Sequence, residues 1–477
     1  MMTARLLRRL RALRELPELR ASALFDAAWY LDHAPDLRAA GVRDAVWHYL
    51  THGAAEGRDP GPRFSTSGHW LQGGRRDENA LLAHLRGAGK FAALPIFRGT
   101  GPIFAGDAPV ILFCAHQAQG MQFGAERSFL TMLARARHAG LTVEVVLPHC
   151  LDPAYLAACR TQARAVRLIP YGWRRAGRVP HPETRAALVQ AIRDSGACAV
   201  HLNTLVCDAP ALAAQDAGVP SVVYLREVPP QDAELCARMD LTPDILRDEL
   251  LSTATRFVAN GPVTAAWIDP DAQMGPDRLV ILPNTVDLGL FDEPFAPTGR
   301  LRVGLIGSTI AKKGIADARA VALGALEAGL DLEVVLIGPA TPDLTALGTL
   351  PANMRHAGYS ATPREAVRQT DIVLSLSHFA ESYGRTIPEA MAAGRPVIVY
   401  DRGTPPQLVG PGAGQIVPAD DPQAVVLALA RWTKDRDALA RASHAARACA
   451  RALQDKAKAV SDALLFREAF PTSAPRK

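Results

Sequence analysis

The sequence predicts a small helical domain followed by two doubly wound α/β domains, each a parallel sheet with helices on both faces. From about residue 109 onward, short apolar β-branched segments alternate with amphipathic segments of helical period, as strands and helices do in such domains. The first hundred residues hold no comparable strand and are rich in His and Trp. With 477 residues, 48% of them hydrophobic, the chain can form two or three domains with separate cores.

Two series of strands are expected, one in each α/β domain. All are unbroken apolar segments, as is usual for strands that helices cover on both sides. The first series is 110–114, 143–147, 199–202 and 221–225, and the second is 301–306, 332–337, 372–376 and 396–400. We therefore predict a helical accessory domain over 1–100, Rossmann-like domains over 105–285 and 286–452, and a C-terminal helix and tail over 453–477. A cleft between the two Rossmann-like domains is the expected ligand site.

Composition excludes several classes of function. The net charge of +5, without basic stripes interleaved with aromatic residues, argues against nucleic acid as a partner. The seven cysteines are scattered and show no zinc-ligand spacing, which favours a reducing compartment and hence the cytoplasm. Four histidines, at positions 33, 48, 52 and 69, have a spacing that fits helix packing better than a metal site.

The N-terminal segment 1–16 alternates leucine with arginine and lacks the uninterrupted apolar stretch of a signal peptide. No segment of about 20 apolar residues that would cross a membrane occurs elsewhere. One interpretation is peripheral contact with anionic lipid at the inner face of the cytoplasmic membrane. The simpler alternative is a solvated helix face.

The most specific motif is SHFAESYGRTIPEAMAAGRPV, over residues 377–397. It follows a predicted strand and opens a helix expected to end at Gly394, so its loop lies at the carboxyl end of the sheet, where α/β folds bind ligands. Backbone N–H groups near Tyr383 and Gly384 are then placed to bind phosphate. Glycine lets a phosphate approach the backbone closely.

Two glutamates in this motif, Glu381 and Glu389, have seven residues between them. Carboxylates at such positions can accept hydrogen bonds from sugar and ribose hydroxyls, although each alone could be an ordinary exposed acid. The stretch resembles the E-x7-E signature of retaining glycosyltransferases of family 4, which have the GT-B fold. The resemblance covers roughly 109–450. It implies that Glu381 contacts the donor sugar and Glu389 the ribose. The residues implied to hold the diphosphate are Ser382, Tyr383, Gly384, Arg385 and Thr386.

The segment VGLIGSTIAKKG, over 303–314, is similar to the strand, loop and Lys-Gly element of the same family. A cation here can neutralise charge on a departing diphosphate. Lys313 is the candidate, because lysine is rare in a chain with 46 arginines and seven lysines. The family often has arginine where Ser308 stands, so the missing charge is expected from Arg385 or Lys312. The donor side further includes Gly307, and Gly358 and Tyr359 are expected near the base.

The first Rossmann-like domain carries the expected acceptor side. After the strand 110–114, a loop with His116 and Gly120 leads into FGAER, over 123–127, which is similar to the family's Gly-Gly-Ala-Glu-Arg loop. Gly124 is a plausible contact, and Phe123 replaces the first glycine. Glu126 and Arg127 could equally form an ion pair at the start of a helix.

Arg226 stands where many members of the family have a histidine, after the strand 221–225. Arginine cannot accept a proton near neutral pH, so we expect it to stabilise charge. His116 and His201 are candidates for the missing imidazole, although packing explains both more simply. Together, Glu381, Lys313 and Arg226 are the residues predicted to act in catalysis.

The resemblance implies transfer of a sugar, with retention, from a nucleoside diphosphate sugar to a glycan or lipid-linked acceptor, with no cofactor or metal. The two Asp-x-Asp segments, 269–271 and 435–437, follow no apolar strand, which also argues against a metal. The segments 25–31, 48–50 and 56–60 resemble an accessory module of bacterial polysaccharide glycosyltransferases. The alternatives are a sugar-nucleotide epimerase of the same fold and a non-catalytic binding protein.

Overall fold

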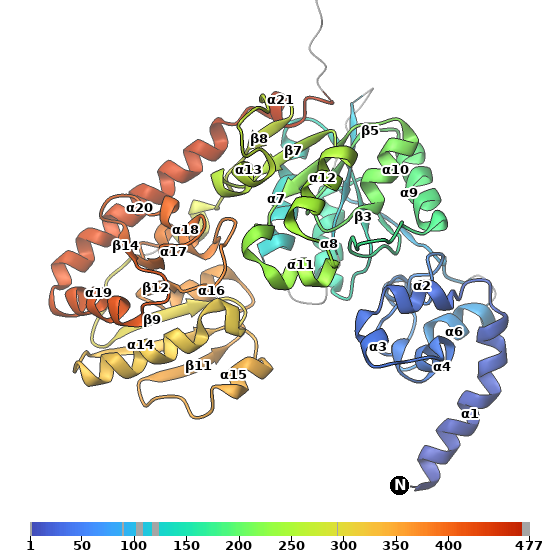
Figure 1. The fold of residues 1–477 in the computed structure, drawn as a ribbon, viewed down its shortest axis with the longest axis horizontal. Helices are drawn as coiled ribbons and strands as arrows, with labels where there is room; N and C mark the ends of the chain where they lie inside the picture. Colours follow the sequence, from blue (N-terminus) through green and yellow to red (C-terminus); the bar gives the residue numbers. More distant parts are fainter. Residues whose placement is uncertain (1, 88–89, 102–107, 117–123, 293, 470–477) are drawn as a thin grey trace, which may run out of the picture. The chain divides into compact units, whose positions relative to one another are not determined.

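The computed structural model describes residues 2–87, 90–101, 108–116, 124–292 and 294–469, and for residues 2–9 it describes the backbone alone. The chain forms two compact units (Figure 1). Unit 1 comprises Met1–Tyr224, Cys236–Phe257 and Asp462–Lys477, and unit 2 comprises Leu225–Leu235 and Val258–Ser461. None of the helices in the described part of the chain has the length and apolar character needed to cross a membrane.

The first part of unit 1 is helical, as predicted. Its elements are α1 (Met2–Ala21), α2 (Ala27–Asp32), α3 (Pro35–Ala39), α4 (Ala45–His48), the π-helical turn η1 (Tyr49–Gly53), α5 (Thr66–Leu71) and α6 (Ala80–Arg86). Short polar side chains begin four of them, because Asp26, Asp44, Ser65 and Asn79 accept hydrogen bonds from backbone N–H groups of the first turn. The core of this region contains Leu19, Tyr30, Tyr49, Phe64 and Leu81.

The histidines of this region pack as predicted. The His33 ring stacks on Trp29 with centroids 3.8 Å apart, and Nδ1 of His48 lies 2.9 Å from the Tyr30 hydroxyl. Burial lowers the pKa of His33 to about 4. Aromatic packing and single hydrogen bonds therefore account for both of these residues.

An eight-stranded sheet has the strand order β1-β4-β3-β2-β5-β6-β7-β8. Its strands are β1 (Ile96–Arg98), β2 (Val110–Cys114), β3 (Thr142–Leu147), β4 (Ala165–Leu168), β5 (Ala197–Leu202), β6 (Ser221–Leu225), β7 (Arg256–Ala259) and β8 (Leu279–Ile281). The central strands β4-β3-β2-β5-β6 pair in parallel, and β1 pairs antiparallel with β4. All four strands predicted here are present, and β1 lies inside the range predicted to be helical.

Unit 2 contains a six-stranded, entirely parallel sheet in the order β11-β10-β9-β12-β13-β14. Its strands are β9 (Leu301–Ile306), β10 (Leu332–Ile337), β11 (Met354–Gly358), β12 (Ile372–Ser375), β13 (Val397–Tyr400) and β14 (Gly414–Val417). Alternate residues of one strand serve different cores: Leu374 belongs to one apolar cluster and Val373 to another. The continuous apolar runs in the sequence thus reflect burial on both faces.

Helices connect the strands of both sheets. After the helical region they are α7 (Gly124–His138), α8 (Pro153–Gln162), α9 (Pro182–Ser195), α10 (Ala209–Ala217), η2 (Pro229–Gln231), α11 (Ala233–Met239), α12 (Pro243–Thr253), α13 (Pro262–Ile268) and η3 (Leu288–Phe291). The second sheet carries η4 (Ala311–Lys313), α14 (Ile315–Glu327), α15 (Pro342–Ala346), α16 (Pro363–Arg368), α17 (Thr386–Ala392), α18 (Pro405–Leu408), α19 (Pro422–Lys434) and α20 (Arg436–Ala459). Many begin with proline, whose fixed φ and missing N–H suit the first helical position. Both α/β parts of the predicted fold class are confirmed.

The end of the chain returns to unit 1 after α20. Its last helix, α21 (Asp462–Leu465), follows residues that belong to unit 2. Arg135 Nε lies 2.6 Å from Asp462 Oδ1, and Arg256 Nη1 donates to Glu468 Oε1 at 2.7 Å. The Arg256 and Glu468 side chains are 4% and 6% exposed. A buried ion pair therefore holds the C-terminal segment in unit 1.

Candidate functional site

The loops that carry the donor-side predictions follow β9 and β12, which are neighbours at the centre of the second sheet. In chain order the strands of this sheet run 3-2-1-4-5-6, and β9 and β12 are the first and the fourth. Connections leave these two strands toward opposite sides of the sheet. This topological switch point is where open α/β sheets bind ligands, beyond the carboxyl ends of the strands.

Gly314 allows the two loops to touch. Its φ is +78°, and a Cβ built on it would stand 2.1 Å from the backbone oxygen of Leu376. Any other residue would be strained in this conformation and would collide with the end of β12. The loops are also joined by the His378 N–H, which donates to the Lys312 carbonyl oxygen at 2.9 Å. The lysine turn is therefore fixed against the motif that follows β12.

Lys313 and Glu381 form an ion pair across these loops. Lys313 Nζ donates to Glu381 Oε1 at 2.8 Å, and the side chains are 29% and 14% exposed. The same carboxylate oxygen accepts a hydrogen bond from the Ser377 hydroxyl. Burial opposes ionisation of Glu381, but the Lys313 cation and the two hydrogen bonds outweigh it and lower the pKa of this carboxyl. Glu381 is thus held as an oriented anion.

Lys312 provides a second cation on the same turn. Its Nζ lies 3.3 Å from Asp232 Oδ2 and 3.4 Å from Glu234 Oε2. The ring of Phe379 lies near both ammonium groups, with its centroid 5.0 Å from Lys312 Nζ and 4.8 Å from Lys313 Nζ, within the range of cation–π attraction. Two positive charges are therefore concentrated at the carboxyl end of β9.

Glu389 lies in the first turn of α17 and is only 3% exposed, so it is not the helix-surface acid that the sequence also allowed. The Nε atom of Arg385 lies 3.5 Å from Glu389 Oε1. Thr386 is the first residue of the same helix, which ends at Ala392, two residues before Gly394. The predicted helix is therefore present, and its first turn carries a buried carboxylate beside a guanidinium.

The three residues after Glu381 have different surroundings. Asn260 Nδ2 donates to Ser382 Oγ at 2.9 Å, and the Tyr383 hydroxyl donates to the Asn284 carbonyl oxygen at 3.1 Å. Burial raises the pKa of Tyr383 to about 12, against the opposing effect of Arg385. Gly384 has a φ of +77°, and a Cβ on it would stand 3.3 Å from Glu381 Oε2. Ser382 and Tyr383 therefore anchor the loop, and Gly384 keeps space beside the Glu381 carboxylate.

The remaining donor-side residues lie along the same edge of the sheet. Gly307 follows β9 directly, next to the half-buried Ser308, and its N–H donates to the Ile337 carbonyl oxygen at 2.9 Å. Gly358 ends β11, and its carbonyl oxygen accepts a hydrogen bond from the Gly338 N–H, also at 2.9 Å. Tyr359 is 42% exposed. Hydrogen bonds therefore connect the loops that follow β9, β10 and β11 along the carboxyl edge of the second sheet.

Arg226 joins this network in unit 2. Its Nη1 donates to Asn284 Oδ1 at 3.3 Å, and the Asn284 carbonyl oxygen accepts the bond from Tyr383. Asn284 therefore connects Arg226 to the loop after Glu381. No motif selects Asn284, because an asparagine in a proline-flanked segment is typical of an ordinary turn.

The acceptor-side residues belong to unit 1. His116 follows β2, and its Nε2 lies 3.1 Å from Oε1 of the buried Glu126 in α7. The alternative ion pair between Glu126 and Arg127 stays a prediction. Gly124 is the first residue of α7, and the predicted contact Gly120 lies outside the described residues, as does Phe123.

His201 lies inside β5 and not in a loop. It is fully buried, and its Nδ1 lies 3.1 Å from the Tyr224 hydroxyl. Burial lowers its pKa to about 3, so the ring is neutral. Packing therefore explains His201, and it does not replace the missing imidazole.

Comparison with known proteins agrees with this arrangement. Residues 293–448 match the family described as glycosyl transferases group 1, and residues 124–290 match glycosyltransferase family 4. The chain belongs to these glycosyltransferase families. The GT-B fold predicted from the sequence is confirmed by solved structures of similar fold, each spanned almost entirely by this chain.

One curated protein is similar to this chain in sequence, and two solved structures are similar to it in fold. A phosphatidyl-myo-inositol mannosyltransferase of Mycolicibacterium smegmatis is 31% identical over 188 residues, which are 37% of this chain and 48% of that protein. This chain thus spans about half the length of that curated relative. HepE of Anabaena, solved with UDP-glucose, matches at a TM-score of 0.57 and 20% identity, over 73% of this chain and 98% of HepE. Sucrose-phosphate synthase of Thermosynechococcus elongatus matches at 0.57 and 17%, over 76% and 99%.

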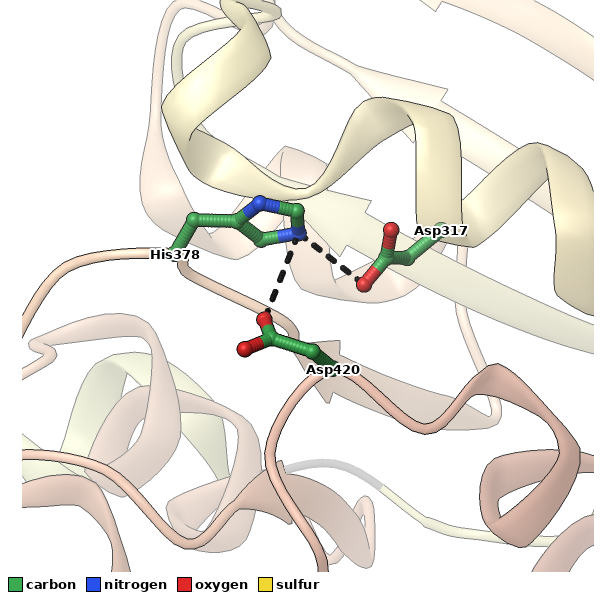
Figure 2. A group of neighbouring side chains, drawn as sticks. All are labelled: Asp317, His378 and Asp420. Carbon is green, nitrogen blue, oxygen red and sulfur yellow. Dashed lines mark hydrogen bonds and ion pairs between the residues drawn. The ribbon is translucent and has the colours of Figure 1, made fainter.

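One side-chain cluster of this glycosyltransferase-family protein had no counterpart in the sequence predictions. His378 lies between two aspartates (Figure 2): its Nε2 is 3.0 Å from Asp317 Oδ2 and 3.8 Å from Asp420 Oδ1. Among the described residues, these three form the one group that could offer a metal ion three ligand atoms, all within 4.8 Å of one another. They are far apart in the sequence, so no spacing could have indicated the cluster.

The surroundings of the cluster favour a structural role. The Tyr400 hydroxyl donates to Asp317 Oδ2 at 2.6 Å, and Arg402 donates to both Asp420 carboxylate oxygens. Arg402 Nη1 also donates to the Ser377 carbonyl oxygen at 3.1 Å. Since a guanidinium already neutralises Asp420, the cluster serves to fasten the loop that leads to Glu381.

Proposed function

We propose that this chain transfers a sugar from a nucleoside diphosphate sugar to a glycan or lipid-linked acceptor, with retention of anomeric configuration and without a bound metal or other cofactor. The observation that carries the proposal is the Lys313–Glu381 ion pair at the switch point of the second sheet. A sugar diphosphate presents hydroxyls to a carboxylate and negative charge to an ammonium group. Glu381 can therefore accept hydrogen bonds from the sugar hydroxyls, and Lys313 can neutralise charge on the diphosphate.

The proposed roles are those that the family resemblance implies, and this arrangement supports them. Lys313 neutralises charge on the leaving diphosphate as the glycosidic bond breaks, with Lys312 beside it. Glu381 accepts hydrogen bonds from the sugar hydroxyls and orients the ring. Glu389 contacts the ribose, Gly358 and Tyr359 lie beside the base, and the backbone from Ser382 to Thr386 binds phosphate oxygens. Similar structures support a nucleotide-sugar donor, since HepE was solved with UDP and with UDP-glucose.

The proposal of retention rests on the resemblance to retaining glycosyltransferases of family 4, and the proposal of metal independence rests on the two lysines of the site. We assign deprotonation of the acceptor hydroxyl to the departing phosphate on the same face, since Arg226 occupies the position of the family histidine and cannot accept the proton. Two lysines supply the positive charge that a divalent ion supplies elsewhere. Arg226 acts through charge, near Asn284 and Tyr383.

For the biological setting we propose surface polysaccharide synthesis in the cytoplasm. The support is the helical region of residues 2–86, which resembles an accessory module of bacterial polysaccharide enzymes, and a curated relative whose name includes the lipid phosphatidyl-myo-inositol. His116 and Gly124, with Gly120 outside the described residues, are the proposed acceptor-side contacts. A surface glycan assembled on a lipid would provide such an acceptor.

The test of the donor site is a thermal-shift screen against UDP, GDP, ADP, CMP and dTDP sugars, with and without EDTA. We expect a rise in melting temperature with one diphosphate base, insensitive to EDTA and much weaker in Glu389→Ala. Glu327→Ala, an exposed acid of α14, is the matched control and should respond like the wild type. No shift with any nucleotide in a folded protein would refute the donor assignment.

Turnover is tested separately, once a donor is known. Release of the nucleoside diphosphate only when an acceptor is present supports transfer, and the anomeric configuration of the product decides retention. Conversion of the nucleotide sugar without an acceptor would instead indicate an epimerase or hydrolase. Donor binding with no turnover across many acceptors would indicate a binding protein.

A further inference from the structure

The helix α1 has one face that the rest of the helical region covers and another that it does not. Ala12 and Leu19 are buried at 8% and 0% exposure, and Leu16 between them is half-buried. They share a face, at spacings of four and three residues. This face packs on α4, η1 and α6. Leu10 and Leu13 lie on another face and are 48% and 51% exposed.

Leu10 and Leu13 form an exposed apolar stripe, because a spacing of three residues places them on one face of the helix. Figure 1 shows the first turns of α1 extending away from α2–α6. About half of the surface of Leu10 and Leu13 is therefore exposed, whereas Ala12 and Leu19 on the packed face are buried.

Charge along α1 is distributed unevenly. The first 14 residues contain five arginines, at positions 5, 8, 9, 11 and 14, and no acid. The two glutamates of the helix lie further on and have partners: Glu15 pairs with Arg11 at 3.2 Å and Arg86 at 3.1 Å, and Glu18 pairs with Arg86 at 2.7 Å. The outer part of the helix therefore carries an excess of positive charge.

We propose that the outer part of α1 binds an anionic lipid surface, lying in the interface with its leucines inserted and its arginines on lipid phosphates. An apolar stripe on an arginine-rich helix is the pattern of interfacial helices. Anionic headgroups match the arginine excess. Pairing with a second copy of α1 would bring ten arginines together without acids, and binding to nucleic acid would leave the leucines unused. The proposal does not depend on the donor site.

The test uses the full chain and vesicles that sediment. We expect co-sedimentation with vesicles of equal phosphatidylglycerol and phosphatidylcholine, and at least about tenfold weaker partitioning onto phosphatidylcholine alone. Binding should weaken strongly between about 0.1 M and 1 M salt, because the Debye length falls from about 10 Å to 3 Å. Equal binding to both vesicles, or binding unaffected by salt, would refute the proposal.

Two double variants separate the apolar and the ionic contributions. Leu10→Ser with Leu13→Ser should reduce partitioning at least about tenfold, because burial of each leucine is lost. The matched control is Leu326→Ser with Leu427→Ser, at leucines 45% and 62% exposed in unit 2, which should bind as the wild type does. Arg9→Glu with Arg14→Glu should abolish the preference for anionic vesicles.

Two further results would overturn the proposal that α1 binds lipid. Wild-type binding by the Leu10/Leu13 variant would overturn the proposal. So would a dimer in solution that this variant abolishes, because a second copy would then cover the stripe. Nucleotide-induced thermal shifts should be the same in the Leu10/Leu13 and Arg9/Arg14 variants as in the wild type, since these substitutions lie in unit 1 and leave unit 2 unchanged.

Discussion

Lys313 Nζ lies 2.8 Å from Glu381 Oε1, although the two residues are 68 positions apart in the chain. They meet because β9 and β12 are adjacent in the sheet and Gly314 lets their loops touch. In the absence of a donor, the Lys313 ammonium group and the Glu381 carboxylate neutralise each other's charge. A bound sugar diphosphate would give each a new partner, so the pair keeps both groups ionised and in place.

Removal of the Lys313 charge tests this relationship. We expect Lys313→Met to lower kcat by about 10²–10³-fold, the usual effect of losing one group that stabilises developing negative charge. The control is Lys458→Met, an exposed lysine of α20, which should retain full activity. Steady-state kinetics with the donor identified by thermal shift provide the measurement. Equal activity of both variants would remove Lys313 from the mechanism.

Ionisation of Glu381 makes stability depend on pH. Its pKa is lower in the folded protein than the usual value of about 4.3. It therefore contributes stability above that value, and this is lost as the pH falls through the folded pKa. Urea unfolding should show a stability difference between wild type and Glu381→Gln that is full near neutral pH and shrinks in acid. A difference that stays constant down to pH 3 would contradict the ion pair.

The same measurement on Lys313→Met should show the opposite trend. Without the ammonium group, burial becomes the dominant effect and raises the pKa of Glu381. A carboxyl with a raised folded pKa destabilises the protein as the pH rises through that value. Stability of this variant relative to Lys313→Met with Glu381→Gln should therefore decrease toward neutral pH.

We expect the protein to tolerate an arginine at position 308 and to bind the nucleoside diphosphate more tightly with it. Ser308 directly follows Gly307 at the carboxyl end of β9, where the family often has this residue, and Ser308→Arg would add a guanidinium for the diphosphate. We expect at least about tenfold tighter binding of the nucleoside diphosphate, since hydrogen bonds to charged groups contribute about 1.5–3 kcal/mol. Thr345→Arg, an exposed site on α15, controls for nonspecific attraction. Equal affinities by calorimetry would show that another cation already serves this role.

Gly314 provides a prediction about stability. Gly314→Ala should cost several kcal/mol in the free energy of unfolding, because the Cβ would stand 2.1 Å from a backbone oxygen. Gly329→Ala is the matched control: its φ is +64° and no atom lies within 4 Å of its Cβ, so only the backbone strain of about 1–2 kcal/mol is expected. Similar losses in both variants would mean that the two loops need not touch.

The sequence predicted the fold through its buried strands. The segments 110–114, 221–225, 301–306 and 332–337 coincide with β2, β6, β9 and β10, because strands covered on both faces are continuously apolar. Strands with exposed or polar residues were missed. β11 contains Arg355 and His356, and the three-residue edge strand β1 exposes Ile96 at 58%. Such strands are defined by their pairing, which the sequence does not display.

The candidate site was predictable where its residues lie within one motif. Glu381, Gly384 and Glu389 occur in a single stretch, and Lys313 was selected by rarity and context. The residues that contact this motif and the lysine turn could not be predicted from a motif. Asp317 lies in the first turn of α14, whereas His378 and Asp420 lie in loops, and Asn260 and Asn284 lie in segments with no motif. Only the order of the strands brings them together.

The return of the chain to unit 1 has a consequence for biosynthesis. Arg256 is buried in unit 1, and its partner Glu468 is 212 residues further along the chain. At roughly 5–20 residues per second, the ribosome adds Glu468 about 10–40 s after Arg256. During that interval a buried guanidinium would lack its carboxylate, which in a finished protein costs about 3–5 kcal/mol. Synthesis of unit 1 therefore begins before that of unit 2, but unit 1 receives its last helix only after unit 2 has been synthesised.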